Sequence, residues 1–460
     1  MVEHDRSFYI ETLGCAKNQV DSEVMIASLE SHGWTRALDA ADASLIVVNT
    51  CGFIGPAKEE SIDTVLSLRA EQPEARILMA GCLVQRYPDE LQADLSEADA
   101  FFGNRAPERI GAFVETHPWN ERRVALPSAG TFDPTAGASV PAAAEAVARR
   151  KAALSFRGSA YLKIAEGCDN RCSFCAIPLI RGPYQSRPPA ELEAELRRLV
   201  LDGAREVSLI AQDLASYGRD GRTPGLVSLL KRLLAADDQV RLRMLYIHPE
   251  RLPRELLELC ATEPRLLPYF DMPMQHADDE LLRRMARTGT GAGYLSLVEE
   301  IREALPQAVL RTSLLVGFPG ESEAAFERLL AFQRQAAFDW LGVFVYSPEE
   351  RTPAYRHYGE LVEPAAEQRK ARLEEAQLPI TYERLDRFVG GDMEVLIEEE
   401  VQGEELAIGR GYPHAPEVDG LVVVRTGGRR LVPGSMVSAR ILRRNGVDLE
   451  AWLPEEGGAR

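Results

Sequence analysis

The chain has 460 residues, too many for one ordinary hydrophobic core, so its length predicts two to four domains. Hydrophobic residues make up 45% and charged residues 27%, a globular composition, and no run approaches the roughly 18 apolar residues of a membrane-spanning helix. The formal charge of −18 argues against a general nucleic-acid-binding surface, because phosphate binding needs basic patches, and suits a basic partner.

Residues 5–117 alternate apolar runs with polar, periodic stretches. The runs, which we interpret as buried strands, lie at 8–15, 43–53 and 75–85. Because a helix-like segment follows each run, we predict βα units and a parallel sheet. Residues 118–153 are rich in Pro, Ala and Gly, which predicts a linker that is partly helical near its end.

The alternation resumes in residues 154–391. Six further apolar runs lie at 161–167, 206–213, 241–249, 266–275, 308–318 and 339–348. Six βα units in series predict a barrel or partial barrel, with an active site at the C-terminal ends of the strands. A charged helical stretch at 364–378 closes this region.

Residues 392–459 have an all-β pattern of short strand-like runs separated by Gly and Pro. The runs lie at 393–399, 406–412, 420–426 and 436–444. This pattern predicts a small antiparallel barrel. The chain as a whole is therefore expected to be a multidomain α/β protein.

Three of the seven cysteines form a C-x3-C-x2-C motif directly after the first barrel strand: Cys168, Cys172 and Cys175. The N-terminus lacks the order of a signal peptide, so we expect a cytoplasmic protein whose spaced cysteines act as metal or catalytic ligands. Three thiolates can hold a four-iron cluster and leave one iron open for a small molecule. Structural zinc stays open as an alternative, although its fourth ligand would be distant, since the nearest histidines are His117 and His248.

A second set of cysteines, Cys15, Cys51 and Cys82, has no local motif. Each cysteine follows an apolar run and precedes a helix-like segment. Because the C-termini of parallel strands share one edge, the three thiols are able to converge there. Separate buried cysteines would give the same pattern, so both interpretations stand on these residues alone. Cys260, in an amphipathic stretch, is expected to be a core residue.

The longer motifs resemble the radical S-adenosylmethionine (SAM) methylthiotransferases. TLGCAKNQVDSE, VVNTCGFIGPAKEESID and AGCLVQRY are similar to the N-terminal domain of that family. AEGCDNRCSFCAIPLIRGPYQSRP, MPMQHADDELLRRMAR and LLVGFPGE resemble its radical SAM core, and GRGYPHAPEVDGLVVV resembles its TRAM domain. The resemblance covers the chain except the linker, and it implies a parallel-sheet N-terminal domain, a partial (β/α)6 barrel and a C-terminal β-barrel.

The resemblance also implies SAM and two 4Fe-4S clusters as cofactors. Cys168, Cys172 and Cys175 would bind the cluster that generates the radical. The auxiliary cluster, whose open iron carries the sulfur to be transferred, would be bound by Cys15, Cys51 and Cys82.

NTCGFIGPAKEESID and PHAPEVDG resemble the RimO branch of the family, which modifies a ribosomal protein, although ETLGCAKNQVDSE departs from the more usual SLGCPKNLVDSE. This branch implies conversion of an aspartate of ribosomal protein S-twelve, free or in the small subunit, to its 3-methylthio form. It also implies an external electron donor and a sulfur source of unidentified kind. The alternatives are a tRNA adenosine methylthiotransferase with the same two clusters and a zinc-stabilised RNA-binding adaptor.

Residues 392–460 carry 13 acidic and 8 basic residues, so stable tRNA binding is not expected. An acidic surface would instead attract a basic ribosomal protein. The clustered acids that are candidates for docking it are Glu398, Glu399, Glu400, Glu404 and Glu405.

Further candidates lie at the expected C-terminal ends of barrel strands, where cofactors bind in such folds. His248 ends the third strand, and His276 follows the fourth. The residues that we predict to line the SAM pocket are Gln212, Asp213, Gln275, Gly317, Gly320 and Glu321. The glycines would let the backbone approach the cofactor closely. Turn and helix-start roles are equally consistent with these residue types.

Overall fold

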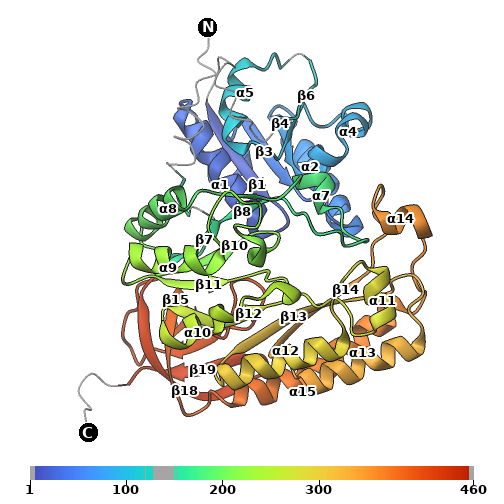
Figure 1. Cartoon of the computed structure of the whole chain (residues 1–460). Coiled ribbons are helices and arrows are strands. Elements are labelled where there is room, and N and C mark those ends of the chain that lie inside the picture. Colours follow the sequence, from blue (N-terminus) through green and yellow to red (C-terminus); the bar gives the residue numbers. More distant parts are fainter. Residues whose placement is uncertain (1–5, 120, 128–149, 153, 455–460) are drawn as a thin grey trace. The chain divides into compact units, whose positions relative to one another are not determined.

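The computed structural model describes residues 6–119, 121–127, 150–152 and 154–454, in two compact units (Figure 1). The first unit comprises residues up to 154 together with 166–170 and 175–184, and the second contains the remainder. The chain thus passes between the units within the C-x3-C-x2-C motif. None of the helices in the described part of the chain has the length and apolar character needed to cross a bilayer.

The first unit contains a parallel sheet with the strand order β2-β1-β3-β4-β5-β6. Three strands coincide with the predicted runs: β1 (Ser7–Thr12), β3 (Leu45–Thr50) and β4 (Arg76–Gly81). Three shorter strands were not predicted: β2 (Thr35–Arg36), β5 (Ala100–Gly103) and β6 (Arg123–Ala125). β6 lies inside the segment expected to be a linker; most of that segment, including its expected helix, lies outside the described residues.

Both faces of this sheet are covered, because successive strand residues point to opposite sides. Leu45 and Val47 of β3 pack with α1 (Ala16–Ser31) and α5 (Ile110–Thr116). Ile46 and Val48 pack with α2 (Gly55–Glu71), α3 (Cys82–Arg86) and α4 (Pro88–Asp94). The unit also contains η1 (Ala40–Asp42), η2 (Pro107–Arg109) and α7 (Ile177–Arg181).

The second unit contains the six predicted barrel strands in the parallel order β14-β13-β12-β11-β10-β7. Their bounds are β7 (Ser159–Lys163), β10 (Glu206–Ile210), β11 (Arg241–Met244), β12 (Leu266–Asp271), β13 (Val309–Val316) and β14 (Trp340–Val345). Two short strands, β8 (Ala165–Glu166) and β9 (Gln185–Ser186), flank the cysteine motif.

Amphipathic helices connect these strands. In α9 (Leu226–Ala236), Leu226, Leu229, Leu230, Leu233 and Leu234 are buried, the spacing of one helix face. The others are α8 (Pro189–Leu201), α10 (Arg254–Thr262), α11 (Asp279–Arg284), α12 (Gly291–Ala304), α13 (Glu323–Ala336) and α14 (Pro353–Tyr358), with η3 (Leu214–Ser216) and η4 (Pro249–Arg251). Cys260 is buried in α10, as predicted.

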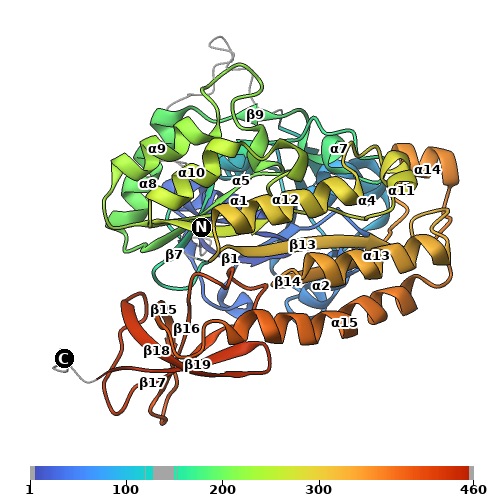
Figure 2. The same ribbon diagram turned by 60° about the horizontal axis from the view of Figure 1, so that its bottom comes forward.

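Helix α15 (Ala366–Asp386) leads into a closed five-stranded barrel (Figure 2). Its strands are β15 (Asp392–Glu400), β16 (Leu406–Arg410), β17 (Val422–Arg425), β18 (Met436–Asn445) and β19 (Asp448–Trp452). Four pairings are antiparallel, as predicted, but β17 pairs with β19 in parallel. The sequence did not predict β19, which is short and has two acids among its five residues.

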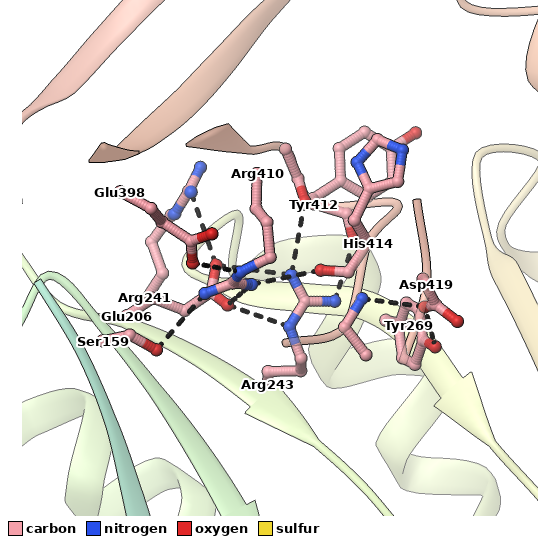
Figure 3. A network of polar contacts seen from close by, with 12 residues as sticks. Ser159, Glu206, Arg241, Arg243, Tyr269, Glu398, Arg410, Tyr412, His414 and Asp419 are labelled. Carbon is pink, nitrogen blue, oxygen red and sulfur yellow. Dashed lines mark hydrogen bonds and ion pairs between the residues drawn. The ribbon is translucent and has the colours of Figure 1, made fainter. Parts of the chain in front are cut away.

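Residues 410–419, which we call the plug segment, join this C-terminal barrel to the parallel sheet (Figure 3). The plug segment contacts a residue on each of the six sheet strands: Ser159, Glu206, Arg243, Tyr269, Arg311 and Trp340. Three of these six, Ser159, Glu206 and Trp340, are the first residues of their strands. The contact is therefore made largely away from the C-terminal strand ends.

Candidate functional site

The structure places Cys15, Cys51 and Cys82 at one edge of the first unit's sheet. They follow β1, β3 and β4, which are neighbours in the strand order. Cys15 is the residue before α1, and Cys82 is the first residue of α3. The three cysteines therefore follow neighbouring strands at one edge of the sheet, as their positions after the predicted strands indicated.

Two glycines allow the loops at this edge to approach each other. Gly14 has φ +93°, and a Cβ there would lie 2.9 Å from the Cβ and 3.2 Å from the Sγ of Cys51. A Cβ on Gly52 would lie 2.8 Å from the backbone nitrogen of Leu83. Side chains at either position would push the cysteine loops apart, so this edge is built for close approach of the three thiols.

Asn18, on the first turn of α1, connects the three loops. Its Nδ2 donates to the backbone oxygens of Leu13 (2.9 Å) and Thr50 (3.0 Å). Its Oδ1 accepts from the Cys82 thiol at 3.3 Å. The Cys82 sulfur in turn accepts from Asn104 Nδ2 and from Arg181 Nη2, each at 3.2 Å. These polar partners were missed in the sequence, although Arg181 lies only six residues after Cys175.

The thiols of this edge have different proton affinities. Burial, reinforced by the other two cysteines, raises the pKa of Cys51 to about 12. Burial also raises the pKa of Cys82 against the effect of Arg181. The pKa of Cys15 is lowered, because Lys17 and Arg181 outweigh the effect of desolvation. Metal binding here would release protons from Cys51 and Cys82, as thiolate ligation requires. Three thiols beside a buried cation fit a cluster with soft, anionic ligands.

The C-x3-C-x2-C motif begins two residues after β8. The Cys168 backbone nitrogen donates to the oxygen of Gly182 at 3.1 Å in the first unit. In the second unit, Ser173 donates from its nitrogen to Met285 (2.9 Å) and from its hydroxyl to the oxygen of Arg284 (2.8 Å). Phe174 packs on a buried cluster that includes Met285. The middle of the motif is thus held by α11 and the residue after it.

Cys172 contacts a polar network that begins at His248, the predicted end of the third strand. His248 and Arg287 lie beside Cys172, and their influence lowers the pKa of its thiol against desolvation. His248 also pairs with Glu250. Glu250 accepts from the Arg287 guanidinium (3.3 Å) and from the Tyr294 hydroxyl. This network gives His248 a role beside a candidate ligand, which position at a strand end alone did not specify.

The residues predicted to line a SAM pocket follow β10, β12 and β13. Asp213 is buried and accepts from Ser216 Oγ (2.7 Å) and Arg251 Nη1 (2.8 Å). Gln212 precedes it. Gln275 has φ +73°, and its backbone bonds to Ser313 (2.9 Å) and Leu315 (2.7 Å) tie it to β13. The strands end earlier than predicted, so these residues lie in the loops that follow them, and their contact with SAM stays a prediction.

Glu321 closes the loop after β13. It is buried, and its carboxylate accepts from the Gly317 nitrogen (2.5 Å) and from Arg369 Nη1 (2.9 Å). It also pairs with His276 Nε2 (3.2 Å). A Cβ on Gly317 would lie 2.4 Å from Ala366 Cβ, and one on Gly320 would lie 2.0 Å from Arg284 Nη1. The two glycines therefore have a packing role, with φ of +77° and +87°, whether or not a cofactor approaches them.

Among the residues with described positions, no three His, Cys, Asp or Glu side chains form a group that could hold a single metal ion.

Three family models match the sequence: Uncharacterized protein family UPF0004 at residues 7–103, Radical SAM superfamily at 162–332 and TRAM domain at 389–453. The solved structure of the radical SAM methyltransferase TsrM from Kitasatospora setae, with cobalamin and a [4Fe-4S] cluster bound, has a similar fold. Its TM-score is 0.53 at 17% identity, covering 76% of this chain and 77% of that one.

Curated relatives match nearly the whole length. The ribosomal protein uS12 methylthiotransferase RimO of Treponema denticola is 41% identical, over 95% of this chain and 98% of the relative. Its counterpart in Desulfosudis oleivorans is 42% identical, over 96% and 98%. Identity at this level over all three matched regions shows that the chain belongs to the RimO family of ribosomal protein uS12 methylthiotransferases, which are sulfur-transferring radical SAM enzymes.

Proposed function

We propose that this chain converts an aspartate of ribosomal protein uS12 to 3-methylthioaspartate. The observation that carries the proposal is the similarity, over nearly the full length, to RimO relatives that are named as ribosomal protein uS12 methylthiotransferases. The presence of two separate cysteine triads supports it. The zinc-stabilised adaptor is set aside, because the matched radical SAM region contains the C-x3-C-x2-C motif.

The cofactors of the family are SAM and two 4Fe-4S clusters. Cys168, Cys172 and Cys175 would hold the cluster that works with SAM. When bound, these groups supply radical chemistry, which is needed because the β-carbon C–H bonds of aspartate are unactivated and acid–base side chains cannot break them. The auxiliary cluster would be held by Cys15, Cys51 and Cys82.

The surrounding side chains orient these ligands. His248 and Arg287 lie beside the Cys172 thiol, and Glu250 pairs with both of them. Outer partners of this kind set the orientation of ligands in metal centres. Glu321 holds the backbone after β13 by accepting from Gly317 and Arg369, so that strand end keeps one conformation.

The chain's acidic surface would suit a basic ribosomal protein, because complementary charges favour docking. Of the five clustered glutamates, Glu398 does not belong to that surface, which corrects the expectation. Its carboxylate is ion-paired with buried Arg410 at 2.6 Å, because it faces the plug segment. Glu399, Glu400, Glu404 and Glu405 remain as candidates for docking. An external electron donor is required as well, and we place the reaction in the cytoplasm, where ribosomes assemble.

Mass spectrometry of uS12 and of bulk tRNA from cells lacking the gene tests this function. The uS12 protein should lose one methylthio group, and tRNA should be unchanged. Expression of the parent chain should restore the modification, whereas a chain with all six triad cysteines replaced by alanine should not. Loss of methylthio groups from tRNA, with uS12 unaffected, would favour the tRNA branch instead.

A further inference from the structure

Arg181 places a buried positive charge beside the auxiliary cysteines. It is the last residue of α7, and 4% of its surface is exposed. Its Nη2 donates to Asn18 Oδ1 at 2.6 Å and to the Cys82 sulfur at 3.2 Å. Its Nη1 donates to Asp21 Oδ2 at 2.6 Å and lies 3.3 Å from Glu166 Oε1. One guanidinium thus binds a thiol sulfur, the residue that connects the three loops, and two carboxylates.

An apolar contact supports the same position. Cys82, Ala176 and Ile180 form a buried hydrophobic cluster, so α7 packs directly against the start of α3. Cys175 lies two residues before α7. The loop that carries the radical-cluster motif therefore continues into a helix whose last residue reaches the auxiliary site.

We propose that Arg181 is a positioning residue for the auxiliary cluster, which it stabilises in its reduced form through its charge and its hydrogen bond to the Cys82 sulfur. The proposal rests on the proposed function, in which Cys15, Cys51 and Cys82 hold that cluster. Reduction adds negative charge, and a buried cation a few ångströms away favours the added charge. Hydrogen bonds to ligand sulfurs also raise the reduction potential of such clusters, so they act in the same direction as the positive charge.

A purely structural role for Arg181 would also explain its burial, since it anchors Asp21 of α1. The neighbouring ion pair between Arg150 and Glu23 offers a matched control. Both of these residues are buried, Glu23 also lies on α1, and the described pair involves no cysteine. Replacing Arg150 removes a buried arginine that pairs with the same helix, α1, without changing the donors to the Cys82 sulfur.

The test uses Arg181→Met, Arg181→Gln, Arg181→Lys and Arg150→Met in the full chain and in the Cys168→Ala/Cys172→Ala/Cys175→Ala background. Each protein is reconstituted anaerobically with iron and sulfide, and the midpoint potential of the auxiliary cluster is measured by an EPR-monitored redox titration. The neutral variants Arg181→Met and Arg181→Gln should retain about four irons in the triple-alanine background. Their potential should shift to more negative values, whereas that of Arg150→Met should stay at the parent value.

An unchanged potential in a neutral variant that retains its iron would overturn the proposal. If both neutral variants lose iron while Arg181→Lys and Arg150→Met keep it, a positive charge is required at the site, which supports the proposal. Loss of iron in Arg181→Lys or in Arg150→Met as well would mean that Arg181 acts only in folding. Failure of the cluster assignment on which the proposal rests would be visible earlier, as a parent chain that binds about four irons rather than eight, whereas failure of the uS12 assignment would be visible in the mass spectrometry of uS12 and tRNA.

Discussion

Replacing Arg410 with alanine should weaken the attachment of the C-terminal barrel. Arg410 is buried, and its Nη1 donates to Glu206 Oε1 at 2.8 Å and to the oxygen of His414 at 3.1 Å. Its Nε donates to Glu398 Oε1 at 2.6 Å, and its Nη2 donates to Ser159 Oγ at 3.2 Å. One side chain therefore joins β16 to two strands of the parallel sheet (Figure 3).

The loss in the free energy of unfolding depends on which buried charges the substitution leaves without a partner. Removing one partner of a buried ion pair costs about 3–5 kcal/mol, because the other charge stays buried without compensation. Glu206 would still be paired with Arg243 at 2.9 Å and with Arg241 at 3.5 Å, so it would lose only part of its ion pairing. Glu398 would lose its described partner. We therefore expect about 3 kcal/mol, near the lower limit, or a fall in Tm of about 6 °C or more.

Thermal unfolding followed by tryptophan fluorescence measures the effect. Trp340 reports on the plug segment directly, since its Nε1 donates to the oxygen of Pro413 at 2.7 Å. Because the chain has two units, the transition of the second unit is analysed separately. Arg430→Ala is the control: this side chain is 88% exposed and lies 3.8 Å from Glu400, so the change should stay within about 0.5 kcal/mol. Arg410→Ala with a Tm equal to that of the control would refute the reasoning.

Four further predictions concern the cysteines, the acidic surface and a buried carboxyl. Alanine at Cys168, Cys172 and Cys175 should abolish reductive SAM cleavage and leave about four irons bound; formation of 5′-deoxyadenosine by this variant would contradict the assignment. Alanine at Cys15, Cys51 and Cys82 should preserve SAM cleavage but prevent sulfur attachment, and loss of both activities with a folded barrel would show one shared function. Lysine at Glu399, Glu400, Glu404 and Glu405 should weaken uS12 binding without affecting SAM cleavage. The affinity that remains should fall less between about 50 and 200 mM salt than that of the parent chain. An unchanged affinity would place docking elsewhere. Burial raises the pKa of Asp419 to about 6 against the effect of Arg311, so the protonated form stabilises the fold below about pH 4 and that contribution is lost as the pH rises through about 6. Unfolding measured at about pH 5 and about pH 7.5 should show this loss in the parent chain and not in Asp419→Asn.

The parallel sheets could be predicted because strands buried on both faces form continuous apolar runs. All six residues of β3 are buried, and its run is recognisable without any knowledge of its neighbours. The strands that were missed have two to five residues: β2 contains only Thr35 and Arg36, and β19 contains two acids. Such strands are defined by the partner to which they hydrogen-bond, which local sequence does not specify.

The cysteine edge could be predicted for a similar reason, since position at the end of a strand is a local property. The contacts of Arg181 could not be predicted, because Cys82 is 99 residues away in the sequence. The contact depends on the position of α7 in the folded chain. The same limit explains the glycines after β13. Sequence position suggested a cofactor approach, which stays a prediction, but it did not reveal that Gly317 and Gly320 pack against Ala366 and Arg284.

Charge patterns have a comparable limit. Glu398 and Glu399 are adjacent in an acidic run, yet successive residues of a strand point to opposite faces. Glu398 faces the buried guanidinium of Arg410, while Glu399 is exposed. A run of acids therefore predicts an acidic region, but the pleat of β15 decides which of its members a partner can reach.

The plug segment and α7 show how two of the longest sequence motifs act through structure. The GRGYPHAPEVDG motif contacts all six strands of the parallel sheet, so the C-terminal barrel and this sheet pack together in the second unit. The RGPYQSRP motif begins at Arg181, which donates a hydrogen bond to the Cys82 sulfur. A substitution in either motif would act on a strand end or a cysteine many residues away. A loss of methylthiotransfer alone does not distinguish the displacement of a cluster ligand from weaker packing of the C-terminal barrel. Variants in these motifs therefore need measurements of stability and of cluster potential as well as of activity.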